Sequence, residues 1–288
     1  MTKKLMPVMM VGALAACSKP NVPDVKQQFI EGDQPRPLVV VLGGSEGGNT
    51  LAEPHWQPFL DGFNHLGTQV AALAYYGSSG TPASAAELSL NSIAERIKKL
   101  TEDPRVNPQC VAVVGFSKGA ELALLLGAHF ETINHVIAIM PSHVSWNAVK
   151  TVTSRASWVL DGQAVDYINA PLLSWQMQKG NITGEFTPAF VTALAEASVD
   201  DIAKARIAVE RTNGPVMLVS AKQDEVWPSY QMASNIEQHL EQVDFAKPFH
   251  HLALDAGHYS FNKAAQVQVH DFLQTTLLNN CHFNGSQK

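Results

Sequence analysis

Short apolar runs alternate along the chain with longer segments in which apolar residues recur every three or four positions. The short runs are typical of buried strands, and the longer periodic segments are typical of amphipathic helices. The pattern predicts strands at 37–42, 69–75, 110–114, 135–140, 215–220 and 249–254. It predicts helices at 56–66, 83–100, 118–129 and about 262–278. Strands that alternate with helices predict an α/β fold, in which a mostly parallel sheet has helices on both faces.

One interval, 142–213, interrupts this alternation. It contains no clear buried strand and one predicted amphipathic helix near 188–210. So long an insertion between two strands is usually functional, and we expect it to form a lid over the strand ends. Its three tryptophans, Trp146, Trp158 and Trp175, have two interpretations. They line an apolar pocket, or they form the small core of the lid itself.

The first residues of the chain have the pattern of a targeting segment. Lys3 and Lys4 precede an apolar stretch at 5–16 that is too short to span a bilayer comfortably. The sequence Leu-Ala-Ala-Cys, which ends at Cys17, resembles the lipobox of bacterial lipoproteins, in which the cysteine becomes the lipidated first residue. We therefore predict a lipoprotein signal peptide at 1–16 and a lipid anchor on Cys17.

The residue that follows the anchor, Ser18, fits sorting to the periplasmic face of a Gram-negative outer membrane, where Asp would not. The alternative is an ordinary secretory signal that is cleaved nearby, and either interpretation predicts an exported protein. The polar, proline-containing segment 17–34 is predicted to be a tether with little structure of its own. The remaining residues, 35–288, are predicted to form one domain that includes the lid.

The composition is that of a globular protein with a sizeable core, since 45% of the 288 residues are apolar and 16% are charged. The net charge of −6 argues against nucleic acid, and against an acidic membrane surface, as a partner. Contact with a membrane is therefore expected only through the lipid anchor.

The sequence G-F-S-K-G at 115–119 joins a predicted buried strand directly to a predicted helix. A G-x-S-x-G pattern in this context is typical of a nucleophile elbow, whose tight turn leaves no room for side chains beside the serine. Ser117 is therefore a candidate nucleophile, and the backbone N–H of Lys118 is a candidate donor to an oxyanion. The alternative is a serine in an ordinary turn. The Lys118 side chain is expected to be solvated, or to cap a nearby group, and not to be catalytic.

A glycine-rich loop, G-G-S-E-G-G at 43–48, follows the first predicted strand. It lacks the G-K-[ST] of a Walker A motif and the G-x-G-x-x-G of a dinucleotide-binding fold. In serine hydrolases a loop at this place supplies the second oxyanion donor, and we expect the backbone N–H of Gly44 or Ser45 to do so. The alternative is a flexible turn without a catalytic role.

A nucleophilic serine needs a histidine base and an acid that orients the base, both on loops at the carboxyl ends of strands. Among eleven histidines, His258 satisfies this requirement because it lies just after the last predicted strand and before the final helix. His250 and His251 lie inside that strand. The alternative for His258 is an ordinary loop histidine with a structural hydrogen bond.

The acid should precede the histidine in the chain, after another strand. Asp224 lies a few residues beyond the strand predicted at 215–220, with Glu225 beside it as a competitor. Asp255 is too close to His258 in sequence to turn back against its ring easily. We prefer Asp224 because the shorter carboxylate is the common choice in this loop. For both acids the alternative is a solvated charge.

Three segments together resemble one known family. They are L-G-G-S-E-G-G at 42–48, A-Y-Y-G at 74–77 and G-F-S-K-G-A-E-L at 115–122. Along about 37–278 the chain is similar to the catalytic C-terminal domain shared by acyl-CoA thioester hydrolases and bile acid-CoA:amino acid N-acyltransferases. The resemblance implies an α/β-hydrolase fold with an inserted lid.

The resemblance also implies a catalytic triad of Ser117, Asp224 and His258. Acyl-transferring members of the family use cysteine as the nucleophile, so Ser117 favours hydrolysis. We expect a serine hydrolase that cleaves an ester or an acyl thioester of a small molecule through an acyl-serine, which needs no metal and no cofactor. The alternatives are a serine acyltransferase, a dienelactone-hydrolase-like esterase, and a lipoprotein that binds a hydrophobic ligand without catalysis.

Once Cys17 is lipidated, two cysteines are left, Cys110 and Cys281. A pair of cysteines in an exported protein suggests a disulfide. Cys110 opens the strand before the elbow, and the final helix should run back to the same edge of the sheet, where it would place Cys281. The alternative is two independent buried thiols.

Overall fold

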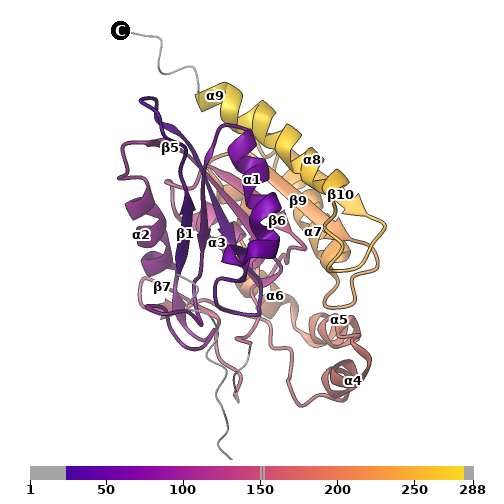
Figure 1. The fold of residues 1–288 in the computed structure, drawn as a ribbon. Helices are drawn as coiled ribbons and strands as arrows, with labels where there is room; N and C mark the ends of the chain where they lie inside the picture. Colours follow the sequence, from indigo (N-terminus) through magenta and orange to yellow (C-terminus); the bar gives the residue numbers. More distant parts are fainter. Residues whose placement is uncertain (1–23, 150, 152, 282–288) are drawn as a thin grey trace, which may run out of the picture.

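The computed structural model describes residues 24–281 apart from 150 and 152. The predicted signal peptide at 1–16 and the predicted lipidation site, Cys17, lie outside the described residues. The core of the fold is a seven-stranded sheet with the order β1-β3-β2-β5-β6-β9-β10 (Figure 1). Its strands are β1 (Val25–Gln28), β2 (Arg36–Leu42), β3 (Gln69–Leu73), β5 (Val106–Phe116), β6 (His135–Ile139), β9 (Val216–Ala221) and β10 (Phe249–Leu254). β1 is antiparallel to β3, and every other neighbouring pair in this sheet is parallel, which is an α/β fold.

Helices cover both faces of the sheet, because its central strands are apolar on both sides. Val39 and Val41 of β2 pack in one cluster with α1 (Gln57–His65) and α8 (Lys263–Leu273). Val40 of β2 faces the opposite way and packs in a second cluster. That cluster includes residues of α2 (Leu90–Leu100), α3 (Lys118–His129) and α7 (Ser229–Gln242). Figure 1 shows α1 in front of the sheet and α3 behind it.

The expectation that 17–34 is an unstructured tether is wrong from Val25 onward. β1 forms the edge of the sheet and pairs with β3, and Asp24 accepts a hydrogen bond from Arg96 at 2.9 Å. Lys26 donates to Gln57 of α1 at 2.6 Å. The sequence V-K-Q-Q lacks an apolar run because an edge strand is held by backbone pairing and by its polar side chains. The pattern of apolar residues therefore did not predict β1.

Two predicted helices differ from the structure at points where a serine caps a helix. The helix expected at 83–100 begins at Leu90, and Ser89 before it accepts the N–H of Ser92. The helix expected near 188–210 is two helices, α5 (Thr187–Glu196) and α6 (Val199–Ala205). Ser198 caps the second by accepting the N–H of Asp201. A serine cap of this kind fixes the residue at which a helix begins, and the spacing of apolar residues alone does not locate that residue.

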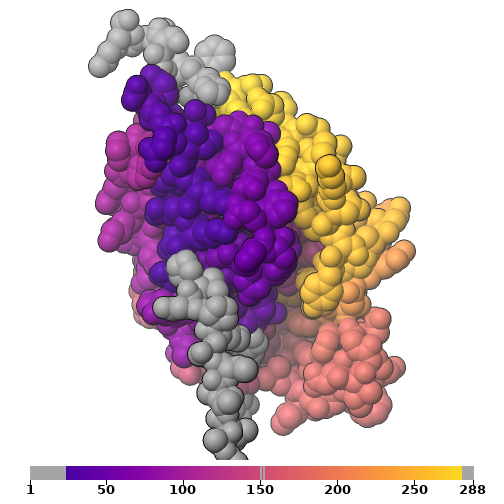
Figure 2. All heavy atoms as spheres, in the orientation of Figure 1, coloured from indigo at the N-terminus to yellow at the C-terminus, as the bar shows by residue number. Residues whose placement is uncertain are grey.

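The inserted segment contributes both a small sheet and a projecting lobe. β7 (Trp158–Leu160) and β8 (Gln163–Ala164) form a three-stranded sheet with β4 (Leu88–Ser89). The lobe carries α5 and α4 (Trp175–Thr183), and Figure 2 shows it projecting below the rest of the protein.

The three tryptophans of the insertion have different environments. Trp146 is 2% exposed and belongs to the apolar cluster of the insertion, which includes Met177 and Ala189. Trp158 is fully buried against the main core, and Trp175 is 75% exposed. Neither expected role, as the wall of a pocket or as the core of the lid, therefore applies to all three tryptophans.

The final helical segment supports the expected position of the second cysteine. After α8 the chain continues through a π-helical stretch, η4 (Gln274–Leu278), into α9 (Asn279–Cys281). Cys110 in β5 is disulfide-bonded, so the alternative of two independent thiols is wrong. Cys110 packs in one cluster with Leu273 and Leu277 of this helical segment. Its bond to Cys281 stays a prediction.

Candidate active site

The carboxyl ends of the parallel strands meet at one edge of the sheet, and the candidate residues lie there. Ser117 follows β5, with a backbone φ of 52° and ψ of −118°. Such a φ is unfavourable for a residue with a side chain and costs about 1–3 kcal/mol. The Ser117 N–H donates to the carbonyl of Ile139 at 2.8 Å, which holds the turn against β6.

Two glycines make this turn possible. A Cβ on Gly115 would lie 2.0 Å from the carbonyl oxygen of Gly119, and a Cβ on Gly119 would lie 2.2 Å from the carbonyl oxygen of Gly43. Both contacts are with backbone, which cannot move aside. The G-x-S-x-G pattern is therefore explained by the crossing of strand, helix and glycine-rich loop at Ser117.

His258 and Asp224 are in direct contact. The Nδ1 atom of His258 lies 2.8 Å from Oδ1 and 2.9 Å from Oδ2 of Asp224, and both residues are buried. Asp224 also accepts hydrogen bonds from the Ser229 hydroxyl and from the N–H groups of Val226 and Trp227. A ring that donates through Nδ1 presents Nε2 as its proton acceptor, which is the state a general base requires.

Glu225, the competing acid, has a different place. Its Oε2 accepts the backbone N–H of His258 at 2.8 Å, and it lies where a side chain on Gly257 would have to be. Glu225 therefore holds the loop of His258 in position, while Asp224 contacts the ring.

The glycine-rich loop lies against the candidate nucleophile. A Cβ on Gly44 would be 3.4 Å from the Cβ of Ser117. The Gly44 N–H donates to Oε1 of Glu46 at 2.9 Å, so it is already engaged and could bind an oxyanion only if Glu46 moved. Ser45 and Lys118, the other expected donors, both line a cavity beside Ser117.

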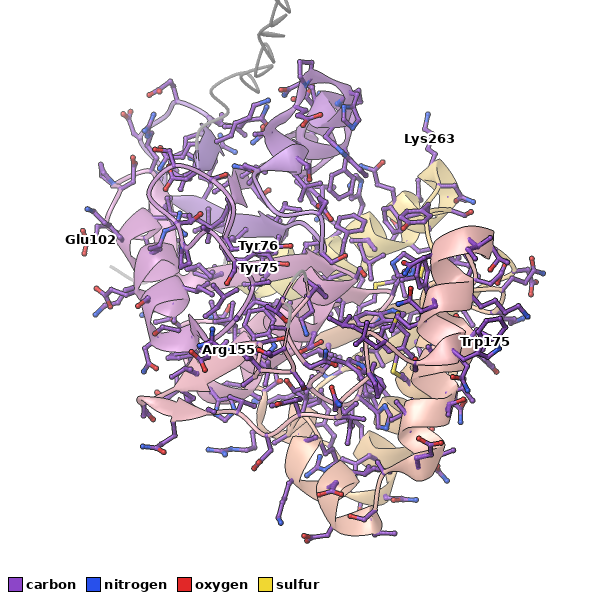
Figure 3. All side chains as sticks on the ribbon, turned by 90° about the horizontal axis from the view of Figure 1, so that it is seen from below. Tyr75, Tyr76, Glu102, Arg155, Trp175 and Lys263 are labelled. Carbon is purple, nitrogen blue, oxygen red and sulfur yellow. The ribbon has the colours of Figure 1, made fainter. Side chains whose placement is uncertain are left out.

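Two tyrosines that sequence reasoning did not assign hold this loop. The Tyr75 hydroxyl donates to the carbonyls of Gly43 and Gly44, at 3.0 and 2.8 Å, and the Tyr76 hydroxyl donates to the carbonyl of Ser45 at 2.5 Å. Burial raises the pKa of both phenols, so they remain protonated donors. Figure 3, which looks onto this edge, shows the two rings side by side near the middle of the view. The A-Y-Y-G segment at 74–77 was the sequence signal that could have identified these two tyrosines.

Of the two arrangements expected for the Lys118 side chain, solvation is wrong, and contact with nearby groups is the one observed. It is 2% exposed, and its ammonium donates to both carboxylate oxygens of Glu121 at 2.9 Å and to the carbonyl of Trp146 at 3.2 Å. Burial lowers the pKa of the Lys118 amine, and the charge of Glu121 opposes this effect. Glu121 also accepts the indole N–H of Trp158 at 2.6 Å and the Ser145 hydroxyl at 3.2 Å. The pair thus joins α3 to the inserted segment.

Two cavities meet at Ser117. The first has a volume of about 370 Å³ and is lined by His258 and Glu46. Its apolar wall is made by Leu51, Trp56, Phe116, Met140 and Phe261. The second has a volume of about 260 Å³, and most of its wall comes from the insertion and from Trp227. Ser117 and Tyr259 line both cavities. A substrate whose scissile bond lies at Ser117 could therefore place one part in each.

Within residues 24–281, excluding 150 and 152, no group of three or more His, Cys, Asp or Glu side chains is arranged to hold a metal ion. The same part of the chain has no helix that is both long and apolar enough to cross a membrane.

Solved structures with this fold support the architecture. An esterase from Pyrococcus furiosus superimposes with a TM-score of 0.58 at 14% identity, over 88% of this chain and 86% of that one. A putative dienelactone hydrolase from Klebsiella pneumoniae gives 0.53 at 12% identity, over 86% and 96%. At these identities the likeness is one of fold, and the fold is that of the α/β-hydrolases.

Curated relatives are similar over the catalytic region. Mitochondrial acyl-coenzyme A thioesterase 2 of Mus musculus is 26% identical over 195 residues, which cover 67% of this chain and 39% of the relative. Acyl-coenzyme A thioesterase 1 of the same species is 25% identical, with 67% and 42% covered. The chain thus spans about two fifths of the length of these relatives. The model of the BAAT / acyl-CoA thioester hydrolase C-terminal family matches residues 88–261, more than half of the chain. This match includes Ser117, Asp224 and His258, and the chain belongs to that family.

Proposed function

We propose that the protein is a serine hydrolase that cleaves an acyl ester or an acyl thioester through an acyl-serine intermediate. The observation that carries the proposal is that His258, which is paired with Asp224, lines a cavity that Ser117 also lines. The thioester part is supported by the family and by its curated relatives, which are named acyl-coenzyme A thioesterases. Serine, histidine and acid follow in the order used by α/β-hydrolases.

In the proposed first half-reaction the Ser117 hydroxyl attacks the substrate carbonyl while Nε2 of His258 accepts its proton. Asp224 stabilises the imidazolium that forms and keeps the ring in the required tautomer. The tetrahedral oxyanion is held by the backbone N–H groups of Lys118 and Ser45, and by that of Gly44 only once Glu46 has moved away from it. Each such donor contributes about 3 kcal/mol in comparable enzymes. Collapse breaks the bond to the leaving group, which takes the proton from His258.

In the second half-reaction water attacks the acyl-serine. His258 accepts a proton from the water and then returns it to the Ser117 oxygen, so that the acid product leaves and the enzyme is regenerated. The two half-reactions together consume one water molecule and release the protonated leaving group and the acid.

A fluorophosphonate probe tests the proposal, because it labels only an activated serine. The wild type should be labelled and should hydrolyse both p-nitrophenyl octanoate and octanoyl-pantetheine. Ser117→Ala should lose both properties with an unchanged circular-dichroism spectrum. The alternative of a ligand-binding protein without catalysis predicts no labelling and no turnover. Product analysis with an added alcohol or amine distinguishes hydrolysis from acyl transfer.

A further inference from the structure

The lobe of the insertion exposes large apolar side chains on its outer side. Leu173, Trp175 and Ile182 are 89%, 75% and 86% exposed, and Figure 3 shows Trp175 at the periphery of the lobe. Trp175 and Ile182 are seven residues apart in α4, so they lie two turns apart on one face of the helix. A group of exposed apolar side chains on one face marks a surface that binds another molecule.

The opposite face of α4 is buried and contributes to the second cavity. Met177 and Gly180 are the buried residues of this helix, and Met177 lines the cavity together with Phe186 and Phe190. An apolar wall of this kind stabilises a hydrocarbon chain by removing it from water. One short helix therefore separates the apolar wall of a cavity beside Ser117 from an apolar outer surface.

The charge of α4 suits the surface of a lipid bilayer that has no net charge. The helix contains one charged residue, the exposed Lys179, which shares the outer face because it lies four residues after Trp175 and three before Ile182. A lysine there extends its ammonium to lipid phosphates while its methylene groups stay beside apolar side chains, and tryptophan is favoured at the boundary of lipid and water. The net charge of −6 disfavours an acidic membrane, but it does not disfavour a zwitterionic one.

The chain enters the fold at the edge of the sheet that carries the lobe. β1 is antiparallel to β3, and Val25 pairs with Leu73, the last residue of β3. The start of β1 therefore lies at the carboxyl ends of the parallel strands, where Ser117 and the lobe also lie. Cys17, the predicted lipidation site, is seven residues before Asp24, and seven extended residues span at most about 25 Å. A lipid anchor on Cys17 would thus hold this edge of the sheet close to the membrane.

We propose that the lobe is a docking surface for a lipid bilayer, into whose interface Leu173, Trp175 and Ile182 insert. On the basis of the proposed function, the substrate is then a membrane-borne acyl ester or thioester, whose acyl chain passes from the bilayer into the second cavity behind α4. This contact is additional to the predicted lipid anchor, and it does not depend on the proposed catalytic residues.

Vesicle flotation tests the docking without the anchor. The Cys17→Ser protein, which lacks the predicted lipidation site, should float with phosphatidylcholine vesicles. Addition of Trp175→Ser/Ile182→Ser should lower its partition coefficient by about tenfold or more. Addition of Val243→Ser, at an apolar residue that is 45% exposed after α7 and before β10, changes the opposite edge of the sheet and should leave partitioning unchanged. Equal partitioning of the lobe variant and this control, or no flotation of the parent, overturns the inference.

Fluorescence quenching locates the contact on the protein. Vesicles of brominated phosphatidylcholine quench tryptophans that enter the bilayer, and they should quench part of the fluorescence of the Cys17→Ser protein. Trp175→Phe keeps an apolar ring for docking and should lose most of this quenching. Quenching that persists in Trp175→Phe places another tryptophan in the bilayer and contradicts the proposal. A dimer in solution that Trp175→Ser/Ile182→Ser dissociates, as measured by light scattering, means that a second copy of the chain covers the lobe, and it also contradicts the proposal.

Two esters separate the route of the substrate from the proposed function. Hydrolysis of p-nitrophenyl palmitate carried in vesicles should be about tenfold or more slower in Trp175→Ser/Ile182→Ser than in the Cys17→Ser parent. Hydrolysis of p-nitrophenyl butyrate in solution should stay within about twofold, because neither residue is among the described residues that line the two cavities. Hydrolysis of both esters that is independent of the lobe, or an equal loss with both, overturns the route and leaves the proposed function intact. No hydrolysis of either ester by the parent overturns the proposed function, while flotation still decides the docking.

Discussion

The ammonium of Lys118 lies 2.9 Å from both carboxylate oxygens of Glu121, and the two side chains are 2% and 0% exposed. This ion pair occupies the first turn of α3, directly after Ser117. Glu121 also receives hydrogen bonds from the inserted segment, including the indole N–H of Trp158. The same pair therefore fixes the backbone of one proposed oxyanion donor and attaches the insertion to the nucleophile helix.

Removal of one charge of the Lys118–Glu121 pair should lower the free energy of unfolding more than removal of both charges. Glu121→Gln leaves the Lys118 ammonium buried without a counter-charge and should lower the free energy of unfolding by about 3–5 kcal/mol. The double variant Lys118→Met/Glu121→Gln removes the stranded charge and should recover part of this loss. Urea unfolding followed by tryptophan fluorescence measures both. A loss below about 1 kcal/mol in the single variant means that water reaches the site.

Asp224 and Glu225 provide a matched pair of acids for testing the triad. Asp224→Asn should reduce kcat by about 10³- to 10⁴-fold, because the amide favours the wrong tautomer of His258. Glu225→Gln keeps an acceptor for the His258 N–H and should reduce kcat by less than about tenfold. Ester hydrolysis at saturating substrate measures both, with thermal unfolding to confirm that the variants are folded. The reverse order of damage contradicts the assignment of Asp224.

The elements that could be predicted from the sequence are those whose signal comes from residues close together in the chain. The buried strands and the elbow at Ser117 belong to this group, because apolar runs and the two required glycines are local features. The burial of Lys118 could not be predicted in this way. Its counter-ion lies three residues away, but the groups that complete the network, such as Ser145 and Trp158, come from the insertion and meet it only through tertiary structure.

A buried histidine should make stability depend on pH. Burial lowers the pKa of His135, which is 6% exposed, from 6.5 to about 4. Between these values the unfolded chain binds the proton and the folded protein does not, so stability is complete above about pH 6.5 and falls as the pH drops toward 4. This residue should account for a loss of about 2–3 kcal/mol between pH 7 and pH 4.5.

Unfolding by urea at the two pH values measures the effect. His135→Gln should flatten the dependence on pH, while His55→Gln, at a side chain that is 65% exposed, should not. If the free energy of unfolding changes with pH in His135→Gln as it does in the wild type, other groups cause the dependence.

The predicted lipid anchor places a covalent modification on Cys17, outside the described residues. In a Gram-negative host, metabolic labelling with an alkyne analogue of palmitate should mark the wild type, which should fractionate with the outer membrane. Cys17→Ser should be unlabelled, and hydrolytic activity in detergent extracts should be retained because the anchor is remote in sequence from the proposed triad. Recovery of unlabelled wild-type protein in the periplasm contradicts the prediction.

The disulfide of Cys110 should close on Cys281. β5 begins at Val106, so Cys110 does not open the strand as expected; it lies two residues before Ala112, which pairs with His135, the first residue of β6. Cys110 packs in one cluster with Leu273 and Leu277, which brings the final helical segment to Cys110 four residues before its last cysteine. A bond across so long a loop stabilises the folded state by about 5 kcal/mol in the chain-entropy model, and measured values are often smaller.

Peptide mapping without reduction identifies the partner directly. A linked pair of peptides that contain Cys110 and Cys281 should appear in protein from an oxidising compartment, and reduction should separate them. Cys281→Ser should lower the free energy of unfolding by about 2–5 kcal/mol, and the same variant compared with the wild type under reducing conditions should show almost no difference. A linked peptide that contains Cys17 in place of Cys281, or two free thiols, contradicts the assignment. Because Cys110 lies at the edge of the sheet opposite Ser117, the loss should appear in stability and leave kcat unchanged at temperatures below the unfolding transition.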